Sequence, residues 1–263
     1  MDRLIDDRLR LTRRDALATV TIASPPMNLF DGRMLDAWRE VVDDLSETPP
    51  RGLLVRAEGR VVSAGVDVSL FKGLGVSGAR RLWSDQIQMI TTLERLPCPT
   101  VFAAHGLTLT AAFEIALACD LLVATPSATF GLVERVVGIT PSMGGGQRLS
   151  LRAGESRAKE LIMTGDTYNA ETLHRWGVVT AVLDEESFAD EAEAYARRLA
   201  EGPTRAHQAT KEIVRSAGEG GVPLADARMP FIASQLFATR DTERAVDAFL
   251  EHGPRHGVEF TGE

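Results

Sequence analysis

Cysteine is scarce in this chain of 263 residues, which contains only Cys98 and Cys119. Two cysteines cannot build the disulfide framework that stabilises many small secreted domains. Both lie in largely apolar stretches of the sequence. We therefore expect two buried, reduced thiols with a packing role.

An excess of positive charge is also lacking, because the formal net charge is -8 at pH 7. Non-specific nucleic-acid binding requires clustered lysine and arginine side chains. No nucleic-acid partner is therefore expected. A small anionic ligand is not excluded, because a single pocket can be locally basic.

Long uninterrupted apolar runs are absent. The stretches over 97–113 and 115–133 are broken by proline, histidine, glycine and aspartate residues, and neither predicts a membrane span. The first seven residues mix charged and apolar side chains and lack the hydrophobic region of a signal peptide. These features predict a cytoplasmic protein without a membrane partner.

The composition that remains is that of a globular protein, with 44% hydrophobic and 25% charged residues. The length suits one large domain, or a core with a smaller appendage. Runs rich in β-branched and apolar residues predict strands over 18–23, 53–57, 100–104 and 120–124. Apolar residues at helical spacing predict helices over 31–46, 79–96 and 110–118.

Strands that alternate with helices predict an α/β fold for the first two-thirds of the chain. Beyond about residue 144 the pattern becomes mostly helical, with a short strand near 178–182. Pro203 suits the first turn of another helix. The helical last third is interpreted as an appendage or an oligomer contact.

Small residues interrupt an apolar segment at 61–68. An ordinary turn explains this pattern if Gly65 supplies a backbone conformation that other residues avoid. A functional interpretation is a backbone N–H directed at a ligand, which small residues allow to approach closely. The segment alone favours the ordinary turn.

Glu114 lies within an apolar predicted helix, where an ionised carboxylate is costly to bury. It either pairs with an arginine or solvent, or burial tunes it for acid–base chemistry. Glu134 also has apolar neighbours, although Arg135 beside it allows an exposed ion pair.

The glycine run over 144–146 either forms a flexible turn or opens a helix whose N-terminus binds an anion. It is not a P-loop, because no Gly-Lys-Ser/Thr sequence follows.

In order and spacing, these segments resemble the crotonase (enoyl-CoA hydratase/isomerase) superfamily over most of the chain. The resemblance is based on 25–29 (PPMNL), 63–67 (SAGVD), Glu114 with the apolar run after it, Phe130-Gly131 followed by Glu134, and Pro141 with 145–149. It implies an α/β spiral of β-β-α turns over 1–200 and a helical C-terminal oligomerisation region over 201–263. It also implies a homotrimer or a homohexamer.

By match to the family motif, the N–H groups of Val66 and Ala111 would form an oxyanion hole. Such a hole stabilises the enolate of an acyl thioester. Glu114 and Glu134 fall on the positions of the acid–base carboxylates of enoyl-CoA hydratases. Glu114 would activate water and Glu134 would supply the α-proton.

Many members of the family keep one of these carboxylates, so two favour hydration. The alternatives are an isomerase or another acyl-CoA enzyme of this fold, and a catalytically silent acyl-CoA-binding paralogue. A purely structural oligomer-forming protein leaves both secluded carboxylates unexplained.

The implied substrate is an acyl thioester of coenzyme A, so neither a separate cofactor nor a metal is expected. Coenzyme A would lie along Ala64, Asp67 and Val68, with Ser142 near the catalytic water. Phe249 and His252 would approach from an adjacent protomer. Three arginines lie in or near the last helical region: Arg240, Arg244 and Arg255. They would either contact the phosphates of coenzyme A or form a solvated charged face.

Three departures from the family pattern concern activity and substrate range, and the first is Ser142, which stands where a glycine is common near the catalytic water. Residues 110–113 (TAAF) replace the glycine run that hydratases commonly show before the first glutamate, and the added methyl groups would narrow the pocket or shift the N–H donor. His252 replaces a common lysine, and an imidazole adds positive charge only when it is protonated.

Overall fold

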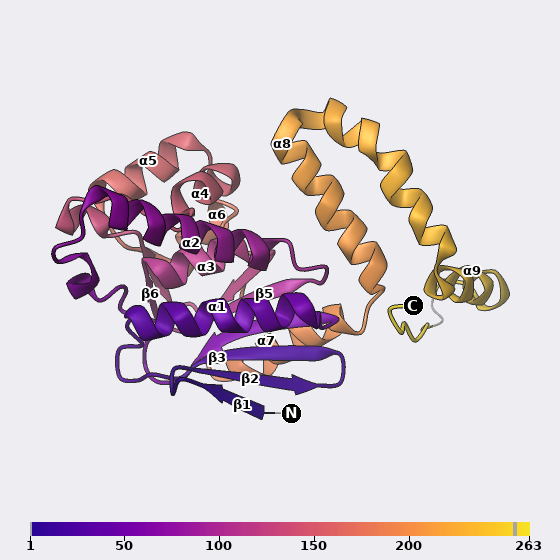
Figure 1. Ribbon diagram of the computed structural model, residues 1–263. Helices are drawn as coiled ribbons and strands as arrows, with labels where there is room; N and C mark the ends of the chain where they lie inside the picture. Colours follow the sequence, from indigo (N-terminus) through magenta and orange to yellow (C-terminus); the bar gives the residue numbers. More distant parts are fainter. Residues whose placement is uncertain (1, 255–256) are drawn as a thin grey trace.

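The computed structural model describes residues 2–254 and 257–263. Its main element is a seven-stranded sheet with the strand order β1-β2-β3-β4-β5-β7-β10 (Figure 1). β1, β2 and β3 pair antiparallel, and every pair from β3 to β10 is parallel. The strands are β1 (Asp2–Ile5), β2 (Leu9–Arg14), β3 (Leu17–Ile22), β4 (Gly52–Ala57), β5 (Thr100–Ala104), β7 (Leu121–Ala124) and β10 (Ala181–Val182).

A smaller sheet of three strands lies beside the main one. It has the order β6 (Leu107–Leu109), β8 (Thr129–Gly131) and β9 (Tyr168–Asn169). β6 and β8 run parallel, so their carboxyl ends lie at the same edge. The segments that follow these two strands are thereby brought together, although twenty residues separate them in the sequence.

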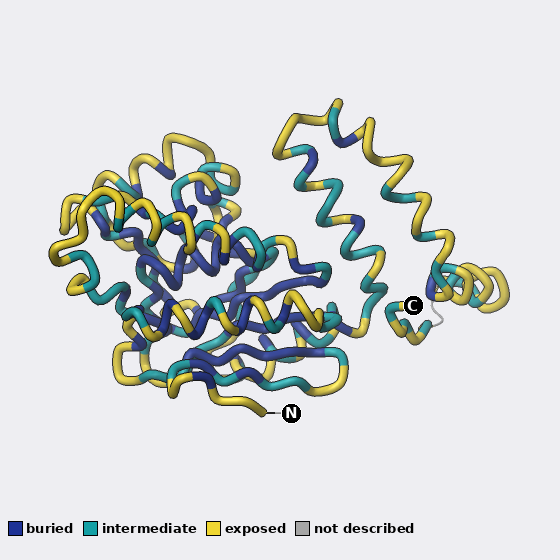
Figure 2. The backbone as a smooth tube through the Cα atoms, viewed as in Figure 1, coloured by how far each residue is buried: buried dark blue, intermediate teal, exposed yellow. Residues whose placement is uncertain are grey.

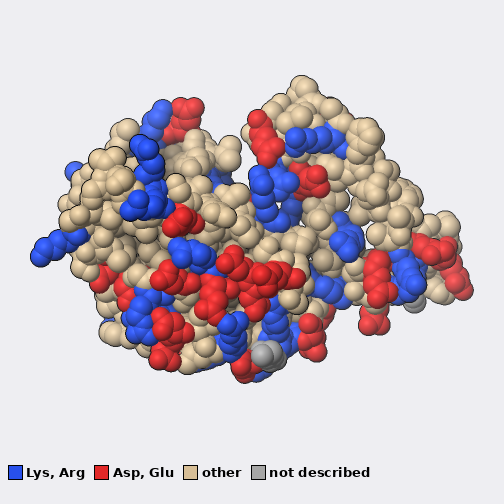
Figure 3. Space-filling model, in the orientation of Figure 1, with Lys and Arg blue, Asp and Glu red and all other residues tan. Residues whose placement is uncertain are grey.

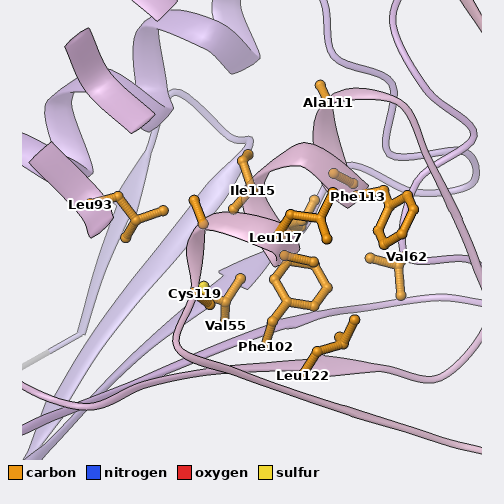
Figure 4. Packing of buried hydrophobic residues seen from close by; sticks show 14 of the residues in the cluster. Val55, Val62, Leu93, Phe102, Ala111, Phe113, Ile115, Leu117, Cys119 and Leu122 are labelled. Carbon is orange, nitrogen blue, oxygen red and sulfur yellow. The ribbon is translucent and has the colours of Figure 1, made fainter. Parts of the chain in front are cut away.

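The main sheet is covered on both faces. Successive side chains of its parallel strands are apolar and point alternately into two cores, one on each face. In β5, Phe102 and Ala104 join the larger core, whereas Val101 and Ala103 join the smaller one. Figure 2 shows the central strands buried, and Figure 4 shows Phe102 packed close to helix α3. Burying one large apolar side chain stabilises the fold by about 1.5–3 kcal/mol.

Helices α1 (Gly32–Glu47), α2 (Val76–Glu94) and α3 (Ala111–Ala118) belong to the larger core, and α7 (Phe188–Ala200) to the smaller. Asp31 caps α1 by accepting the Met34 N–H at 2.8 Å. Such a cap stabilises a helix by about 1 kcal/mol. The outer face of α1 is acidic (Figure 3), with Asp36, Glu40, Asp43, Asp44 and Glu47.

The remaining helical elements include η1 (Val68–Phe71), η2 (Glu134–Val137), α4 (Gly145–Ala153), α5 (Glu155–Thr164) and α6 (Ala170–Arg175). The C-terminal part contains α8 (Thr204–Ser234), η3 (Gln235–Ala238) and α9 (Arg240–His252). α8 folds back on itself, because Gly220 and Gly221 are not helical. Lys211 ties the first arm of α8 to the core through Asp120, with 2.7 Å between nitrogen and oxygen.

Apolar side chains remain exposed along this C-terminal part, which Figure 1 shows projecting from the core. Phe231, Phe237 and Leu250 are each at least three-quarters exposed. Phe249 lines a groove of about 410 Å³ between α9 and the start of α8. No helix in the described ranges is both long and apolar enough to cross a membrane.

The strands and helices predicted from the sequence are present, with ends that differ by a few residues. The structure confirms the α/β fold with a helical C-terminal region, and both cysteines are free and buried. Burial raises the pKa of each thiol to about 12. The segment at 61–68 forms two isolated bridges, at Ser63 and Val66.

Candidate active site

The turn at 63–67 lies beside the loop that leads into α3. Ser63 pairs with Thr108 in parallel, and the Leu109 N–H donates to the Ser63 carbonyl at 3.1 Å. Three residues further along each segment come Val66 and Ala111. The parallel pairing therefore carries these two peptide groups to the same end of the site.

Both of these N–H groups are free. Within the described ranges, neither the Val66 N–H nor the Ala111 N–H donates to a backbone or side-chain acceptor. Ala111 is the first residue of α3, where an N–H has no acceptor within the helix. Gly65 makes the sharp turn before Val66 with a φ of 108°, which requires glycine in practice.

Glu114 and Glu134 follow the two parallel strands of the small sheet. Glu114 lies in the first turn of α3, just after β6, and Glu134 opens η2, just after β8. The Thr110 N–H donates to the Gly131 carbonyl at 2.9 Å and fixes the two strand ends together. The carboxylates are consequently close enough for the charge of Glu114 to act on Glu134.

Glu114 is 2% exposed, and one carboxylate oxygen accepts two backbone N–H groups. Met143 donates to Oε1 at 2.9 Å and Gly145 at 2.8 Å. Burial raises the pKa of Glu114 to about 7, although both N–H donors and the charge of Arg148 act in the opposite direction. The carboxyl group is therefore near its titration midpoint at neutral pH.

Glu134 is 9% exposed, and its Oε2 atom has no partner among the described residues. Burial, and then repulsion from Glu114, raises the pKa of Glu134 to about 8. The neighbouring Arg135 does not neutralise it. That guanidinium donates outward to the Thr164 carbonyl at 2.9 Å, so the exposed Glu134–Arg135 ion pair is not formed.

The glycine run at 144–146 forms the N-terminus of α4. The anion bound at this helix terminus is supplied by the protein itself. The N–H of Gly145, at the start of α4, donates to the Glu114 carboxylate. A Cβ atom on Gly145 would lie 2.8 Å from Glu114 Cγ, so the contact requires glycine. The sequence left a flexible turn and an anion-binding helix start both open, and it gave no sign that Glu114 is the anion.

Arg148 supports this contact and was not identified from the sequence. Its guanidinium is paired with Glu94 of α2 at 2.6 Å and donates to the Gly144 carbonyl at 3.3 Å. It thereby fixes the start of α4 to α2. The Gln-Arg-Leu sequence after a glycine run gave no sign of this role, because Glu94 lies 54 residues away.

The other proposed substrate contacts near the turn are arranged along one stretch. Ala64 is half-buried and Val68 is exposed, whereas the Asp67 carboxylate caps η1 by accepting the Ser69 N–H at 2.9 Å. This hydrogen bond lowers the pKa of Asp67. Ser142 is half-buried and donates to the Thr140 carbonyl at 2.7 Å. Their contacts with a substrate remain predictions.

Within one chain, Phe249 and His252 are not near the residues of the candidate active site. Both lie on α9, which Figure 1 shows far from α3 and α4. Their approach from an adjacent protomer remains a prediction. Arg240 and Arg244 lie on the same helix, and Arg255 lies outside the described residues.

Comparison with known proteins identifies the group of proteins with this arrangement. The family model for enoyl-CoA hydratase/isomerase matches residues 12–258. The chain belongs to the enoyl-CoA hydratase/isomerase family. This result confirms the resemblance to the crotonase superfamily that the motifs indicated.

Relatives within the enoyl-CoA hydratase/isomerase family resemble this chain over most of its length. It is 29% identical to a crotonyl-CoA hydratase of Syntrophomonas wolfei, covering 93% of this chain and 95% of the relative. It is 30% identical to a carnitinyl-CoA dehydratase of Salmonella enteritidis, covering 82% and 83%. The solved structure of an enoyl-CoA hydratase from Mycobacterium smegmatis superposes with a TM-score of 0.86 at 26% identity, covering 92% and 96%.

Proposed function

We propose that this protein hydrates trans-2-enoyl thioesters of coenzyme A. The observation that carries the proposal is the pair of buried carboxylates, Glu114 and Glu134, both with pKa values raised to near neutrality. Acid–base groups work best when their pKa lies near the working pH. A site with one ionised and one protonated carboxyl can accept one proton and donate another.

The hydrogen bonds favour one division of roles. Glu114 accepts two N–H groups, which stabilise its ionised form, whereas Oε2 of Glu134 lacks a partner. At neutral pH the shared proton therefore resides mainly on Glu134. Glu114 then suits the base that activates water, and Glu134 suits the acid.

The reaction follows from these roles. Glu114 takes one proton from water while the hydroxide oxygen bonds to the β-carbon. The electrons of the double bond move toward the thioester oxygen, where the N–H groups of Val66 and Ala111 would stabilise the charge. Glu134 then gives its proton to the α-carbon. Exchange of protons with solvent restores the starting state of both carboxyl groups.

The test is turnover of trans-2-enoyl-CoA thioesters of increasing chain length, followed by loss of the absorbance of the conjugated double bond. Glu114→Gln and Glu134→Gln should each lower kcat by about 10²–10⁴. Glu155→Gln is a matched control, because this exposed side chain pairs with Lys159 on the surface of α5.

Three outcomes separate hydration from its alternatives. Conversion of 3-enoyl-CoA without hydration of 2-enoyl-CoA would identify an isomerase. Binding of acyl-CoA without turnover of either substrate would identify a silent paralogue. Full activity in both glutamine variants would exclude the proposed mechanism.

A further inference from the structure

Thr110 has a backbone conformation that threonine rarely adopts. Its φ is 48° and its ψ is -119°, values close to the first central position of a type II′ turn. That position normally requires glycine, and a β-branched residue there is an outlier. Such strain is found where the surrounding structure enforces it, often at functional sites.

The hydroxyl of Thr110 does not perform the usual task of its position. Thr110 is the N-cap of α3, where a threonine ordinarily accepts an N–H from the first turn. Here that cap bond is not made, and Oγ1 has no hydrogen-bond partner among the described residues. The residue is 6% exposed, so this hydroxyl is a buried polar group whose hydrogen-bonding capacity is unused within the described residues.

The orphan hydroxyl lies at the candidate oxyanion hole. A Cβ atom added to Gly65 would be 2.9 Å from Thr110 Oγ1 and 3.5 Å from its Cγ2. Gly65 directly precedes Val66, and Thr110 directly precedes Ala111. The threonine hydroxyl therefore packs against the residue that precedes one candidate donor and belongs to the residue that precedes the other.

We propose that the Thr110 hydroxyl is a third hydrogen-bond donor to the thioester oxygen of the substrate, an inference that rests on the proposed enolate chemistry. A thioester oxygen can only accept, whereas a hydroxyl can rotate its hydrogen toward that oxygen. The oxygen gains charge as the enolate forms. A fixed donor at this point therefore stabilises the transition state more than the bound substrate.

Thr110→Val is the decisive variant, because valine keeps the β-branched shape and removes the hydroxyl. The expected result is a fall in kcat of about 10²–10³-fold with little change in KM, since removing one donor to an oxyanion has an effect of this order. Thr110→Ser, which keeps the hydroxyl, should restore much of the lost rate. Thr110→Ala provides a second hydroxyl-free variant if valine prevents folding.

Thr108→Val is the matched control. Thr108 is also buried, two residues away, but its hydroxyl donates to the Gly106 carbonyl at 3.0 Å. This variant tests whether any buried threonine in the loop affects the rate through packing. An equal loss of kcat in Thr108→Val and Thr110→Val would overturn the proposal.

A second measurement does not depend on turnover. Acetoacetyl-CoA ionises to an enolate with its own ultraviolet absorption, and donors to its thioester oxygen favour the ionised form. Thr110→Val should lower the fraction of bound enolate relative to wild type. If wild type ionises this ligand but hydrates no enoyl-CoA, the hydratase proposal fails, and a lower enolate fraction in Thr110→Val than in wild type still supports the third donor. Equal enolate fractions and equal kcat in wild type and Thr110→Val would overturn the third donor.

Discussion

Burial and mutual repulsion set the acid–base behaviour of individual residues in this protein. The pKa of Glu114 is raised to about 7 and that of Glu134 to about 8, mainly by burial. Hydration needs one ionised and one protonated carboxyl at the same time. In the proposed mechanism the active state is therefore the singly protonated pair, which is most populated between these two values.

We expect a bell-shaped dependence of kcat/KM on pH. The rate should fall below about pH 7, where both carboxyl groups are protonated, and above about pH 8, where both are ionised. The two limbs belong to the coupled pair and not to single residues. Initial rates from pH 5.5 to 9.5 test this, and a flat profile across that range would contradict it.

The same shifts affect stability. A carboxyl whose pKa is higher in the folded state binds its proton more tightly there. Its stabilising contribution is complete below the unfolded value of 4.5 and is lost as the pH rises through about 8. Ionised Glu134 consequently lowers the free energy of unfolding of the wild-type protein at alkaline pH.

Glu134→Gln should therefore be more stable than wild type at pH 8.5, by on the order of 2–4 kcal/mol, and should show a smaller difference at pH 5. Urea unfolding followed by circular dichroism at both pH values measures this. Glu155→Gln again serves as the control, since its carboxylate is exposed on α5. A pH-independent difference between Glu134→Gln and wild type would show that the glutamate is not strained by ionisation.

Residue identity revealed part of this site in advance. Two glutamates in apolar sequence indicated carboxylates that are costly to bury, and both are indeed buried. The Met143 N–H, the Gly145 N–H and the Arg148–Glu94 pair were not foreseen. They depend on contacts between segments far apart in the chain, which no local pattern specifies. The conformation of Thr110 was equally hidden, because threonine ordinarily favours other backbone angles.

At the scale of elements, close packing of α7 on the main sheet depends on a glycine in β4. A Cβ atom on Gly52 would lie 2.6 Å from the Ala200 Cβ and 3.0 Å from its Cα. This is too close for any real pair of carbon atoms, and the Ala200 backbone cannot rotate away. α7 would have to move off the sheet to accommodate a side chain.

Gly52→Ala should destabilise the protein by about 1–3 kcal/mol, the usual effect of overpacking. Gly218→Ala is the matched control, because Gly218 lies in the helical first arm of α8 with open space at its Cβ. There the same change should stabilise the helix by about 0.5–1 kcal/mol. Chemical unfolding of both variants tests the pair, and equal effects would contradict the packing argument.

The long apolar elements were predictable from the sequence, because burial requires apolar residues at a regular spacing along each helix or strand. β5 was predicted over its full span, and the helix predicted over 31–46 corresponds to α1. β1 and β2 were missed because they form an edge hairpin with charged side chains, several of which pair with α1. β9 was also missed, because its two residues are too few to produce a pattern, whereas the short strand predicted near 178–182 contains β10.

At the scale of the whole molecule, the C-terminal helices have apolar surface that this chain does not cover. Phe237 is 83% exposed and Leu250 is 77% exposed, on neighbouring elements η3 and α9. Isolated exposed side chains are common, but several along one projecting part mark an interaction surface. A second copy of this chain is the partner that the family resemblance implies.

We expect sedimentation to show three or six times the chain mass of 28.5 kDa. Phe237→Asp combined with Leu250→Asp should shift the protein toward the monomer, because charged side chains oppose burial in an interface. Leu4→Asp is the control, since Leu4 is an exposed leucine, at 53%, that lies on β1 and not on the C-terminal helices. A wild-type protein of 28.5 kDa in solution would contradict the expected assembly.

The position of the active-site segments along the chain also has a consequence for the newly synthesised protein. Every contact of Glu114 and Glu134 described above is made by residues up to 148, before α8 begins at Thr204. The stretch over 204–252 takes roughly 2–10 s to translate at ~5–20 residues per second. The uncovered apolar surface therefore leaves the ribosome after the core to which Lys211 anchors the first arm of α8. The core can consequently form before this surface is present to make competing apolar contacts.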